Sequence, residues 1–304
     1  MQLLDFFHNF LASSAFYQIE IWRDVLFSIG LIFLSLHLHR VLKVVIIPMF
    51  FSEGDMISKY GENTWAIITG ASAGIGREFC LKLAEKGFNI VLMARDLGRM
   101  KNVEDEIRMK YPQVETKLIV SDFKNAVKDG FFEGIMEQLV GLDISILVNN
   151  VGMHFKGFEE ASVQEIKNLI IVNCIPHAVL TRNLLSQLQK REKRSAIIDI
   201  SSIGATFPRS HSPIYSATKV FNDFLSRGIQ DLYSNIDVIS IRPRFVMTQM
   251  TNFKKPDINT VLPEDVVVNS LASLGKMDAT AGALKHRFTE WRYLTLPSFI
   301  TGFK

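Results

Sequence analysis

The segment TGASAGIG, residues 69–76, constrains the fold of this chain more than any other part of the sequence. It follows the apolar run WAIIT, residues 65–69, and it precedes apolar residues spaced four apart at Ile75, Phe79 and Leu83. The apolar run predicts a short buried strand, and the spacing predicts an amphipathic helix that begins near Ile75. A strand, a glycine-rich turn and a helix in this order are typical of a parallel α/β sheet.

The same alternation of strand and helix continues along the chain. One of the predicted helices begins at Ser162, with Glu165 three residues later, which is the pattern of a capping box. Continuous apolar strands separated by amphipathic helices indicate a sheet covered on both faces, so we predict an α/β fold with a doubly wound parallel sheet of the Rossmann type. The further predicted strands are residues 89–94, 118–120, 144–149, 196–201 and 237–241.

Charge and cysteine content exclude several classes of function. The formal net charge is +3 and no dense basic stripe is present, so we expect no nucleic-acid partner. The two cysteines, Cys80 and Cys174, cannot form a disulfide framework and lack metal-ligand spacing. We therefore expect a reducing compartment and no metal site.

The N-terminal region is apolar enough to cross a membrane. Residues 25–42 nearly satisfy the length of about 20 apolar residues that a spanning helix needs. Because the apolar residues lie on all sides of such a helix, a membrane anchor is favoured over a buried helix of a soluble protein, which stays the alternative. We predict a segment over 1–51 with its anchor at about 25–42, a linker over 52–62, and a nucleotide-binding domain over 63–304.

Basic residues around this segment indicate its orientation. Arg23 precedes it among three acidic residues, whereas Arg40, Lys43 and Lys59 follow its apolar centre. Cytoplasmic flanks carry an excess of Lys and Arg, so we expect the C-terminal domain to face the cytosol.

The glycines of residues 69–76 fit a pyrophosphate-binding turn. In such a loop one glycine permits the tight turn, one lets the backbone approach the phosphates, and one allows close packing of helix and strand. Gly70, Gly74 and Gly76 supply this set. The helix that begins near Ile75 presents free N–H groups and a positive dipole end to the phosphates.

The segment YSATK, residues 215–219, places Tyr215 and Lys219 four residues apart. On a helix this spacing puts both side chains on one face. A lysine ammonium group near a phenol favours the phenolate, so we expect Lys219 to lower the pKa of Tyr215 and make it a better proton donor near neutral pH. Alone this pattern is a common accident of sequence.

The loop TGASAGIG, the segment NNVG at 149–152 and YSATK together resemble the short-chain dehydrogenase/reductase family. The resemblance implies that Ser202, 13 residues before Tyr215, hydrogen-bonds the substrate carbonyl. It also implies that Asn173 holds a water in a proton path from Lys219. Pro176 lies three residues further on and should bend this helix, which would expose backbone oxygen to that water.

The resemblance further implies the residues that bind the cofactor. Asp122 would hold the adenine ring, Asn149 and Gly152 would steady the central strand behind the adenosine ribose, and Val246 and Thr248 belong to the segment that holds the nicotinamide carboxamide. The full predicted set is Gly70, Ser72, Gly74, Ile75, Gly76, Arg95, Asp122, Asn149, Gly152, Tyr215, Lys219, Pro243, Val246 and Thr248.

The identity of the nicotinamide cofactor depends on residues 94–96. An acid at this strand end binds a ribose 2′-hydroxyl, and an arginine accommodates a 2′-phosphate. Arg95 and Asp96 are adjacent, so counting alone does not decide. The acid-bearing members of the family carry the acid where Ala94 stands here, so the resemblance favours NADP(H) with Arg95 on the phosphate.

One departure from the family pattern points to a branch. Pro243 is followed by Arg244 where the family usually has glycine. Membrane-anchored members that act as very-long-chain 3-oxoacyl-CoA reductases or 17β-hydroxysteroid dehydrogenases also have a bulky residue there. The resemblance implies an NADPH-dependent reductase of a lipid ketone in the endoplasmic reticulum membrane, with homodimerisation through the helices of Asn173 and Tyr215. The alternative is a non-catalytic NADP(H)-binding membrane scaffold.

Overall fold

The structure is a computed structural model, and it describes residues 2–155, 157–207, 209–251 and 260–295. A parallel sheet of seven strands in the order β3-β2-β1-β4-β5-β6-β9 forms its centre. The chain starts in the middle of the sheet and winds outward in both directions, which is the order of a dinucleotide-binding domain. The predicted doubly wound parallel sheet is therefore confirmed.

The strands lie close to their predicted positions. They are β1 (Trp65–Thr69), β2 (Asn89–Ala94), β3 (Thr116–Val120), β4 (Ile144–Asn149), β5 (Ser195–Ile200), β6 (Ile236–Ile241) and β9 (Ala279–Thr280). A separate pair, β7 (Phe245–Val246) and β8 (Thr260–Val261), lies beyond the end of β6. The sequence did not reveal β9, because a strand of two residues is too short to show a period.

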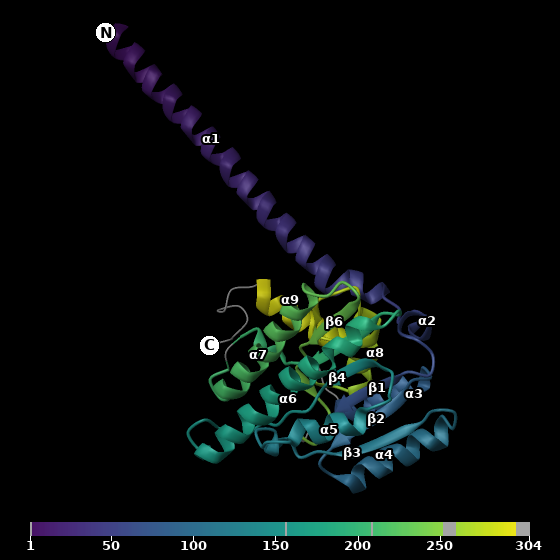
Figure 1. Ribbon diagram of the computed structural model, residues 1–304. Coiled ribbons are helices and arrows are strands. Elements are labelled where there is room, and N and C mark those ends of the chain that lie inside the picture. Colours follow the sequence, from purple (N-terminus) through teal and green to yellow (C-terminus); the bar gives the residue numbers. More distant parts are fainter. Residues whose placement is uncertain (1, 156, 208, 252–259, 296–304) are drawn as a thin grey trace.

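Two layers of helices cover the sheet (Figure 1). One apolar core joins the sheet to α3, α4 and α8, and a second joins it to α5 and α6 on the opposite face. Within β1, Ile68 belongs to the first core and Ile67 to the second, as alternating side chains of a strand require. The helices of the domain are α2 (Met56–Tyr60), α3 (Gly74–Glu85), α4 (Leu97–Lys110), α5 (Phe131–Leu139), α6 (Val163–Lys190), α7 (Pro213–Gln230), α8 (Pro263–Ser273) and α9 (Leu284–Thr295).

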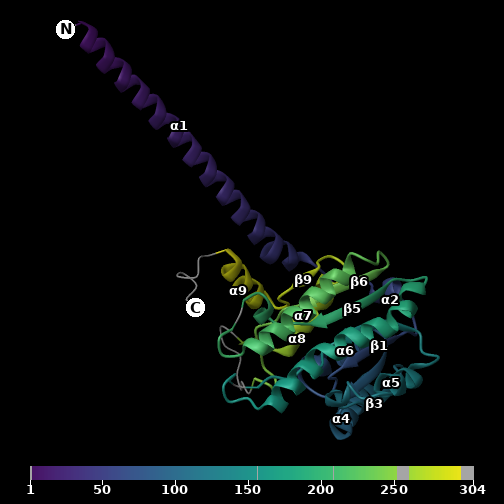
Figure 2. The same ribbon diagram turned by 60° about the vertical axis from the view of Figure 1, so that its left-hand side comes forward.

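Helix α1 (Gln2–Val41) stands away from the domain in both views (Figures 1 and 2). It continues into a π-helical turn (Leu42–Ile46) and a 3₁₀ turn (Ile47–Phe50). Near its base, Arg40 Nη1 donates to the carbonyl of Leu294 at 2.9 Å, and His37 Nε2 lies 3.3 Å from the carbonyl oxygen of Thr295. The base of α1 therefore meets the end of α9, and the rest of α1 is a candidate anchor.

Residues 52–62, which we expected to be a linker, contain α2 and pack on the domain. Met56 and Tyr60 are buried. The Tyr60 hydroxyl donates to Asp237 Oδ2 at 2.8 Å, and Lys59 Nζ lies 2.7 Å from the same oxygen. The polar composition of this segment concealed two apolar anchors, because single buried residues leave no periodic pattern.

Candidate active site

A cavity of about 600 Å³ lies at the carboxyl ends of the central strands, where ligands bind in open α/β sheets. Most of the predicted site residues line it. These are Gly70, Ser72, Gly74, Ile75, Arg95, Asp122, Gly152, Ser202, Tyr215, Lys219, Pro243, Val246 and Thr248. Three predicted residues, Gly76, Asn149 and Asn173, lie next to the cavity without lining it.

The glycine loop turns where the sequence places it. Gly70 and Gly74 adopt positive φ angles of 66° and 57°, which glycine adopts without strain. A Cβ at Gly76 would lie 2.3 Å from the carbonyl oxygen of Gly70, so Gly76 lets α3 pack against the turn. Helix α3 begins after Ala73, which provides no side-chain cap. Its first N–H groups are thus available to an anion in the cavity.

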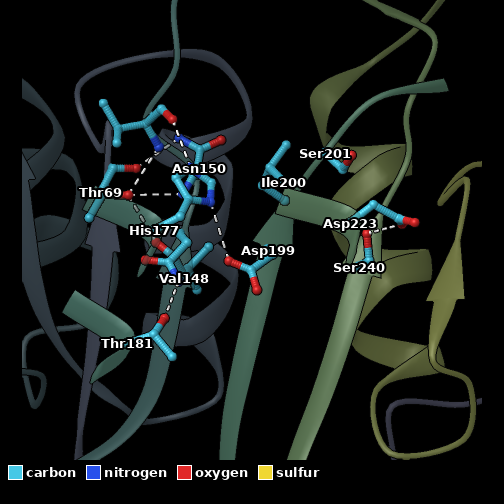
Figure 3. A network of polar contacts seen from close by, with 12 residues as sticks. Thr69, Val148, Asn150, His177, Thr181, Asp199, Ile200, Ser201, Asp223 and Ser240 are labelled. Atoms are coloured by element: carbon cyan, nitrogen blue, oxygen red, sulfur yellow. Dashed lines mark hydrogen bonds and ion pairs between the residues drawn. The ribbon is translucent and has the colours of Figure 1, made fainter. Parts of the chain in front are cut away.

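The ends of β1 and β4 are held together by polar contacts (Figure 3). Thr69 Oγ1 accepts hydrogen bonds from the backbone N–H groups of Asn150 at 2.9 Å and Val151 at 3.0 Å. Asn150 Nδ2 donates to the carbonyl of Thr69 at 2.8 Å. These bonds fix the crevice between the two strands that border the point where the winding of the sheet reverses.

The two asparagines of NNVG have different roles. Asn149 is the last residue of β4 and donates to Thr181 Oγ1 on α6 at 2.9 Å, so it steadies the strand from behind. Asn150 is the residue that lines the cavity. Sequence reasoning missed Asn150, although it is the first residue past the carboxyl end of a buried strand, the usual place of a ligand contact.

The far end of the cavity suits an adenosine phosphate. Arg95 lines this end and is exposed. Asp96 instead caps α4 by accepting from Arg99 N at 3.0 Å, and its other oxygen pairs with Arg99 Nε at 3.2 Å. Because the carboxylate of Asp96 is engaged, Arg95 is the side chain available to a 2′-substituent. Lys124, which the sequence analysis did not single out, adds a second cation at this end.

Ser202 and Tyr215 meet at the other end of the cavity. Ser202 follows β5, and its hydroxyl oxygen accepts from Gly204 N at 3.1 Å. The Tyr215 phenol, from the first turn of α7, lies close enough to the Ser202 side chain for this hydroxyl to oppose the rise of the Tyr215 pKa. The ring of His154 lies edge-on to that of Tyr215, with 4.8 Å between centroids. A carbonyl oxygen placed here would find two hydroxyl donors.

Lys219 is buried one turn after Tyr215 on α7. Its Nζ donates to the carbonyl of Ile200 at 2.8 Å, so at least one further N–H is free to point into the cavity. Burial lowers the pKa of Lys219 to about 8. The amine therefore stays largely protonated at neutral pH and loses its proton in the mildly alkaline range.

The expected lowering of the Tyr215 pKa by Lys219 is not what the structure gives. Burial raises the pKa of Tyr215, and the groups that oppose this rise are the Ser202 hydroxyl and the Arg209 guanidinium. Lys219 Nζ lies 5.8 Å from the centre of the Tyr215 ring and is turned to the carbonyl of Ile200. The helical spacing correctly predicted that the two residues lie on one face of α7. The Lys219 ammonium group, however, donates its hydrogen bond to the backbone carbonyl of Ile200.

Asn173 joins α6 to the loop after β4. Its Oδ1 accepts from Met153 N at 2.8 Å, and its Nδ2 donates to the carbonyl of Met153 at 3.1 Å and to Thr218 Oγ1 at 3.0 Å. The side chain therefore fixes the loop and α7 relative to each other. Helix α6 runs through Pro176 as one element, and the water path at Asn173 stays a prediction.

Sequence reasoning missed a buried pair below this site, His177 and Asp199. His177 Nε2 donates to the carbonyl of Val151 at 3.0 Å, and Nδ1 lies 3.3 Å from Asp199 Oδ1 (Figure 3). The two side chains are almost fully buried. They hold the end of β4 to β5. His177 lies one turn past Asn173 on the predicted helix, and this spacing was the available signal.

The residues of the cavity fit a dinucleotide. The uncapped start of α3 offers N–H donors for a pyrophosphate, and a Cβ at Gly74 would lie 2.9 Å from Thr248 Cγ2, so this contact leaves no room for a side chain. The buried hydroxyl of Ser121, beside Asp122, has no hydrogen-bond partner among the described residues and is free to bind a ligand. Arg95, Lys219 and these groups are complementary to an anionic nucleotide.

Comparisons with known proteins agree with this geometry. A family model described as short chain dehydrogenase matches residues 64–259. The very-long-chain 3-oxoacyl-CoA reductase-A of Danio rerio is 36% identical over 88% of this chain and 85% of its own length. The corresponding reductase of Macaca fascicularis is 35% identical over 79% of this chain and 78% of its own.

Among solved structures, a short-chain dehydrogenase from Sphingobium yanoikuyae in complex with NADPH has a TM-score of 0.63. It is 26% identical and covers 69% of this chain and 84% of its own. The predicted enzyme class, an oxidoreductase with a nicotinamide cofactor, is confirmed at the level of the family, and NADP(H) is consistent with it. The chain therefore belongs to the short-chain dehydrogenase family.

Proposed function

We propose that this protein is an NADPH-dependent reductase of a lipid ketone, held at a membrane by α1 with its catalytic domain in the cytosol. The observation that carries the proposal is the cavity itself. It joins a phosphate-binding turn and Arg95 at one end to Ser202, Tyr215 and Lys219 at the other. A nucleotide and a carbonyl compound can therefore occupy one continuous space.

Ser202 and Tyr215 act on the substrate carbonyl. When bound, NADPH supplies a hydride to the carbonyl carbon. The oxygen then gains negative charge, and the two hydroxyl groups are placed to donate hydrogen bonds to it. Tyr215 gives its proton to that oxygen, and its raised pKa keeps the phenol protonated and ready to donate before reaction.

The remaining residues hold the reactants. Lys219 presents its free N–H donors to the nicotinamide ribose, and Asn173 keeps Met153 and Thr218 in place around it. Gly152 leaves room beside both, since a Cβ there would already contact Lys219 Nζ at 3.4 Å and Asn173 Oδ1 at 3.5 Å. Recharging of the Tyr215 proton passes through Lys219 and a water held near Asn173.

The substrate class is proposed from the relatives and from the candidate anchor. The similar proteins are named very-long-chain 3-oxoacyl-CoA reductases. Residues 18–50 form an apolar helical segment, and none of its most apolar stretch is buried against the domain. A lipid ketone partitions into a bilayer, so a reductase anchored there meets a high local concentration of its substrate.

The test is a substrate panel with the full-length protein in detergent. We expect NADPH oxidation with long-chain 3-oxoacyl-CoA or with a 17-oxosteroid, and none when the ketone is left out. Tyr215→Leu serves as the inactive control. If neither class of ketone is reduced, the proposed function is wrong.

Arg95→Asp tests the cofactor assignment separately. The exchange removes the proposed contact to the 2′-phosphate and supplies an acid for the 2′-hydroxyl of NADH. We expect the preference for NADPH over NADH, measured as a ratio of kcat/KM values, to fall by at least tenfold. Arg108→Asp, on the outer surface of α4, is the matched control. An unchanged ratio would show that Arg95 does not bind the 2′-phosphate.

The scaffold hypothesis makes different predictions. A membrane protein that only binds NADP(H) has no need for a serine and a tyrosine close together at the end of its cavity. It would bind NADPH and reduce no ketone. The predicted homodimer through α6 and α7 also stays a proposal, for which the exposed Phe221 and Phe224 on α7 are candidate contacts.

A further inference from the structure

Two arginines gather beyond Tyr215, at the end of the cavity away from Arg95. The Cζ of Arg209 lies 5.5 Å from the centre of the Phe245 ring, and the Cζ of Arg244 lies 5.2 Å from the same centre. Arg244 lines the cavity with Tyr215 and Ser202. Two guanidinium groups therefore share one aromatic ring near Tyr215.

Arg209 lies close to the reacting groups. A Cβ on Gly204 would be 3.9 Å from Arg209 Cδ and 3.5 Å from Ser202 Oγ, so the arginine stem passes beside the serine that binds the carbonyl. The positive charge of Arg209 opposes the rise of the Tyr215 pKa and helps to lower that of His154, which shows that its field reaches both rings.

Arg209 has no acidic partner among the described residues. Over the ranges that the structure describes, it forms no ion pair and no hydrogen bond, and its close partners are an aromatic ring and a second arginine. Of the described residues that line the cavity, Asp122 alone is acidic, and it follows β3 at the opposite edge of the sheet. Burial and the charge of Arg244 both lower the pKa of Arg209.

A guanidinium group in a partly desolvated place beside a second cation costs free energy when no anion offsets its charge. An anion bound to Arg209 would reduce this cost. The planar fork of a guanidinium group matches the two oxygens of a carboxylate or phosphate, and an aromatic ring holds that plane in place. A neutral ketone offers no such compensation.

We propose that Arg209, beside Arg244, receives a negatively charged group of the substrate, so that the enzyme reduces an anionic ketone in preference to a neutral one. This inference rests on the proposed function and narrows it. The charged group is a phosphate of a coenzyme A thioester or a carboxylate of the substrate itself. A neutral 17-oxosteroid lacks both.

The test compares three substrates with one 3-oxoacyl chain in the full-length protein with NADPH. They are the coenzyme A thioester, the free 3-oxo acid, and the neutral N-acetylcysteamine thioester. We expect the wild type to favour one of the charged compounds over the neutral thioester by about tenfold or more in kcat/KM. Whichever charged compound is favoured identifies the source of the charge.

Arg209→Gln should reduce that preference by about tenfold, mainly through KM for the charged compound. Arg209→Lys should retain part of the preference, because it keeps the charge and loses the fork. Arg182→Gln, an exposed arginine on α6, is the matched control and should leave the preference unchanged.

Three results would overturn the inference. They are a wild-type enzyme that favours the neutral thioester, an Arg209→Gln variant with an unchanged preference, and an equal loss of kcat on all three substrates. The last result would mean that Arg209 acts on Tyr215 rather than on substrate charge. In each of these cases a ketone is reduced, so the proposed function still holds. A wild-type enzyme that is inactive on every ketone would contradict both the proposed function and the inference about substrate charge.

Discussion

Helices α1 and α6 are both long and apolar enough to cross a membrane, yet they have opposite surroundings. The apolar part of α1 has no buried stretch, and side chains such as Leu26 and Phe27 are each 66% exposed. Half of the most apolar stretch of α6 is buried, and Leu180, Leu184 and Leu188 pack on the sheet without exposure. Composition alone does not distinguish a membrane anchor from a core helix. The two differ in whether their apolar side chains pack against the sheet.

This difference also explains why the chemistry lies on α6 and not on α1. A helix packed on a sheet holds a side chain such as Asn173 in one position, here through three hydrogen bonds. Helix α1 offers exposed apolar area, which costs free energy in water and is favourable in lipid. We therefore expect changes in α1 to affect where the protein lies, and changes in the domain to affect stability and turnover.

The largest effect should come from charges placed in α1. Leu31→Arg combined with Leu34→Arg puts two guanidinium groups in the middle of the apolar segment, at a cost of about 5–7 kcal/mol for insertion. We expect the variant to leave the membrane pellet after alkaline carbonate extraction.

The control for this experiment carries the same two charges on the domain, as Met109→Arg with Val140→Arg, at residues that are 78% and 79% exposed. That variant should stay in the pellet. If the α1 variant also stays there, α1 is not the anchor and the contrast between the two helices fails.

A second prediction compares leucines of the two helices directly. Leu184→Ala removes a fully buried side chain from α6 and should lower the free energy of unfolding by about 2–5 kcal/mol. Leu34→Ala, at a position 64% exposed on α1, should change it by less than about 0.5 kcal/mol. Denaturant unfolding in detergent measures both, and equal losses would show that α1 is part of the folded core.

A third, smaller effect concerns the junction between the two regions. Asp237 accepts from Tyr60, Lys59 and Arg194, and thereby ties residues 52–62 to β6. Since Lys59 and Arg194 are over a third exposed, we expect Asp237→Asn to cost about 1–3 kcal/mol of unfolding free energy. A loss below about 0.5 kcal/mol would mean that this junction does not hold the segment.

The contribution of Asp237 should depend on pH. Burial alone would raise its pKa, but the hydrogen bonds from Arg194, Lys59 and Tyr60 outweigh burial and lower it. The stabilisation is therefore fully present above the unfolded-state pKa of about 4 and is lost as pH falls through the lower folded-state pKa. Unfolding curves of wild type and Asp237→Asn should converge in that acidic range. A constant difference would argue against a charged carboxylate.

The smallest expected effect is a pH dependence of the affinity for NADPH, which comes from a buried lysine of the domain. Burial lowers the pKa of Lys219 to about 8, so its positive charge is present at pH 7 and largely absent at pH 9. We expect the affinity for NADPH, measured by cofactor fluorescence, to fall severalfold over this range. Lys219→Arg keeps its charge and should remove the step near pH 8. A step that persists in that variant would belong to another group.

The sequence predicted those helices and strands that leave a recognisable pattern of apolar residues or a capping signal. Strands such as β1 and β2 were placed to the residue, because each is a short apolar run between turn signals. The start of α6 was placed by the capping box of Ser162 and Glu165, which the structure confirms. Short or polar elements such as α2 and β9 leave no such pattern.

The candidate site was predictable where a motif fixes the backbone. The glycine loop and the pairing of Ser202 with Tyr215 belong to this kind. Features that depend on long-range contacts were not predictable. The turn of Lys219 toward the carbonyl of Ile200 and the stacking of Arg209 on Phe245 arise only when separate segments meet.

The central claim is that the nucleotide-binding domain reduces a ketone with Tyr215 as proton donor. Tyr215→Phe removes one oxygen atom and keeps the ring that packs against His154. The decisive measurement is turnover of long-chain 3-oxoacyl-CoA by this variant, together with its affinity for NADPH. We predict a loss of turnover of about a thousandfold or more, with the affinity for NADPH kept within a fewfold. Turnover within tenfold of the wild type would contradict the account.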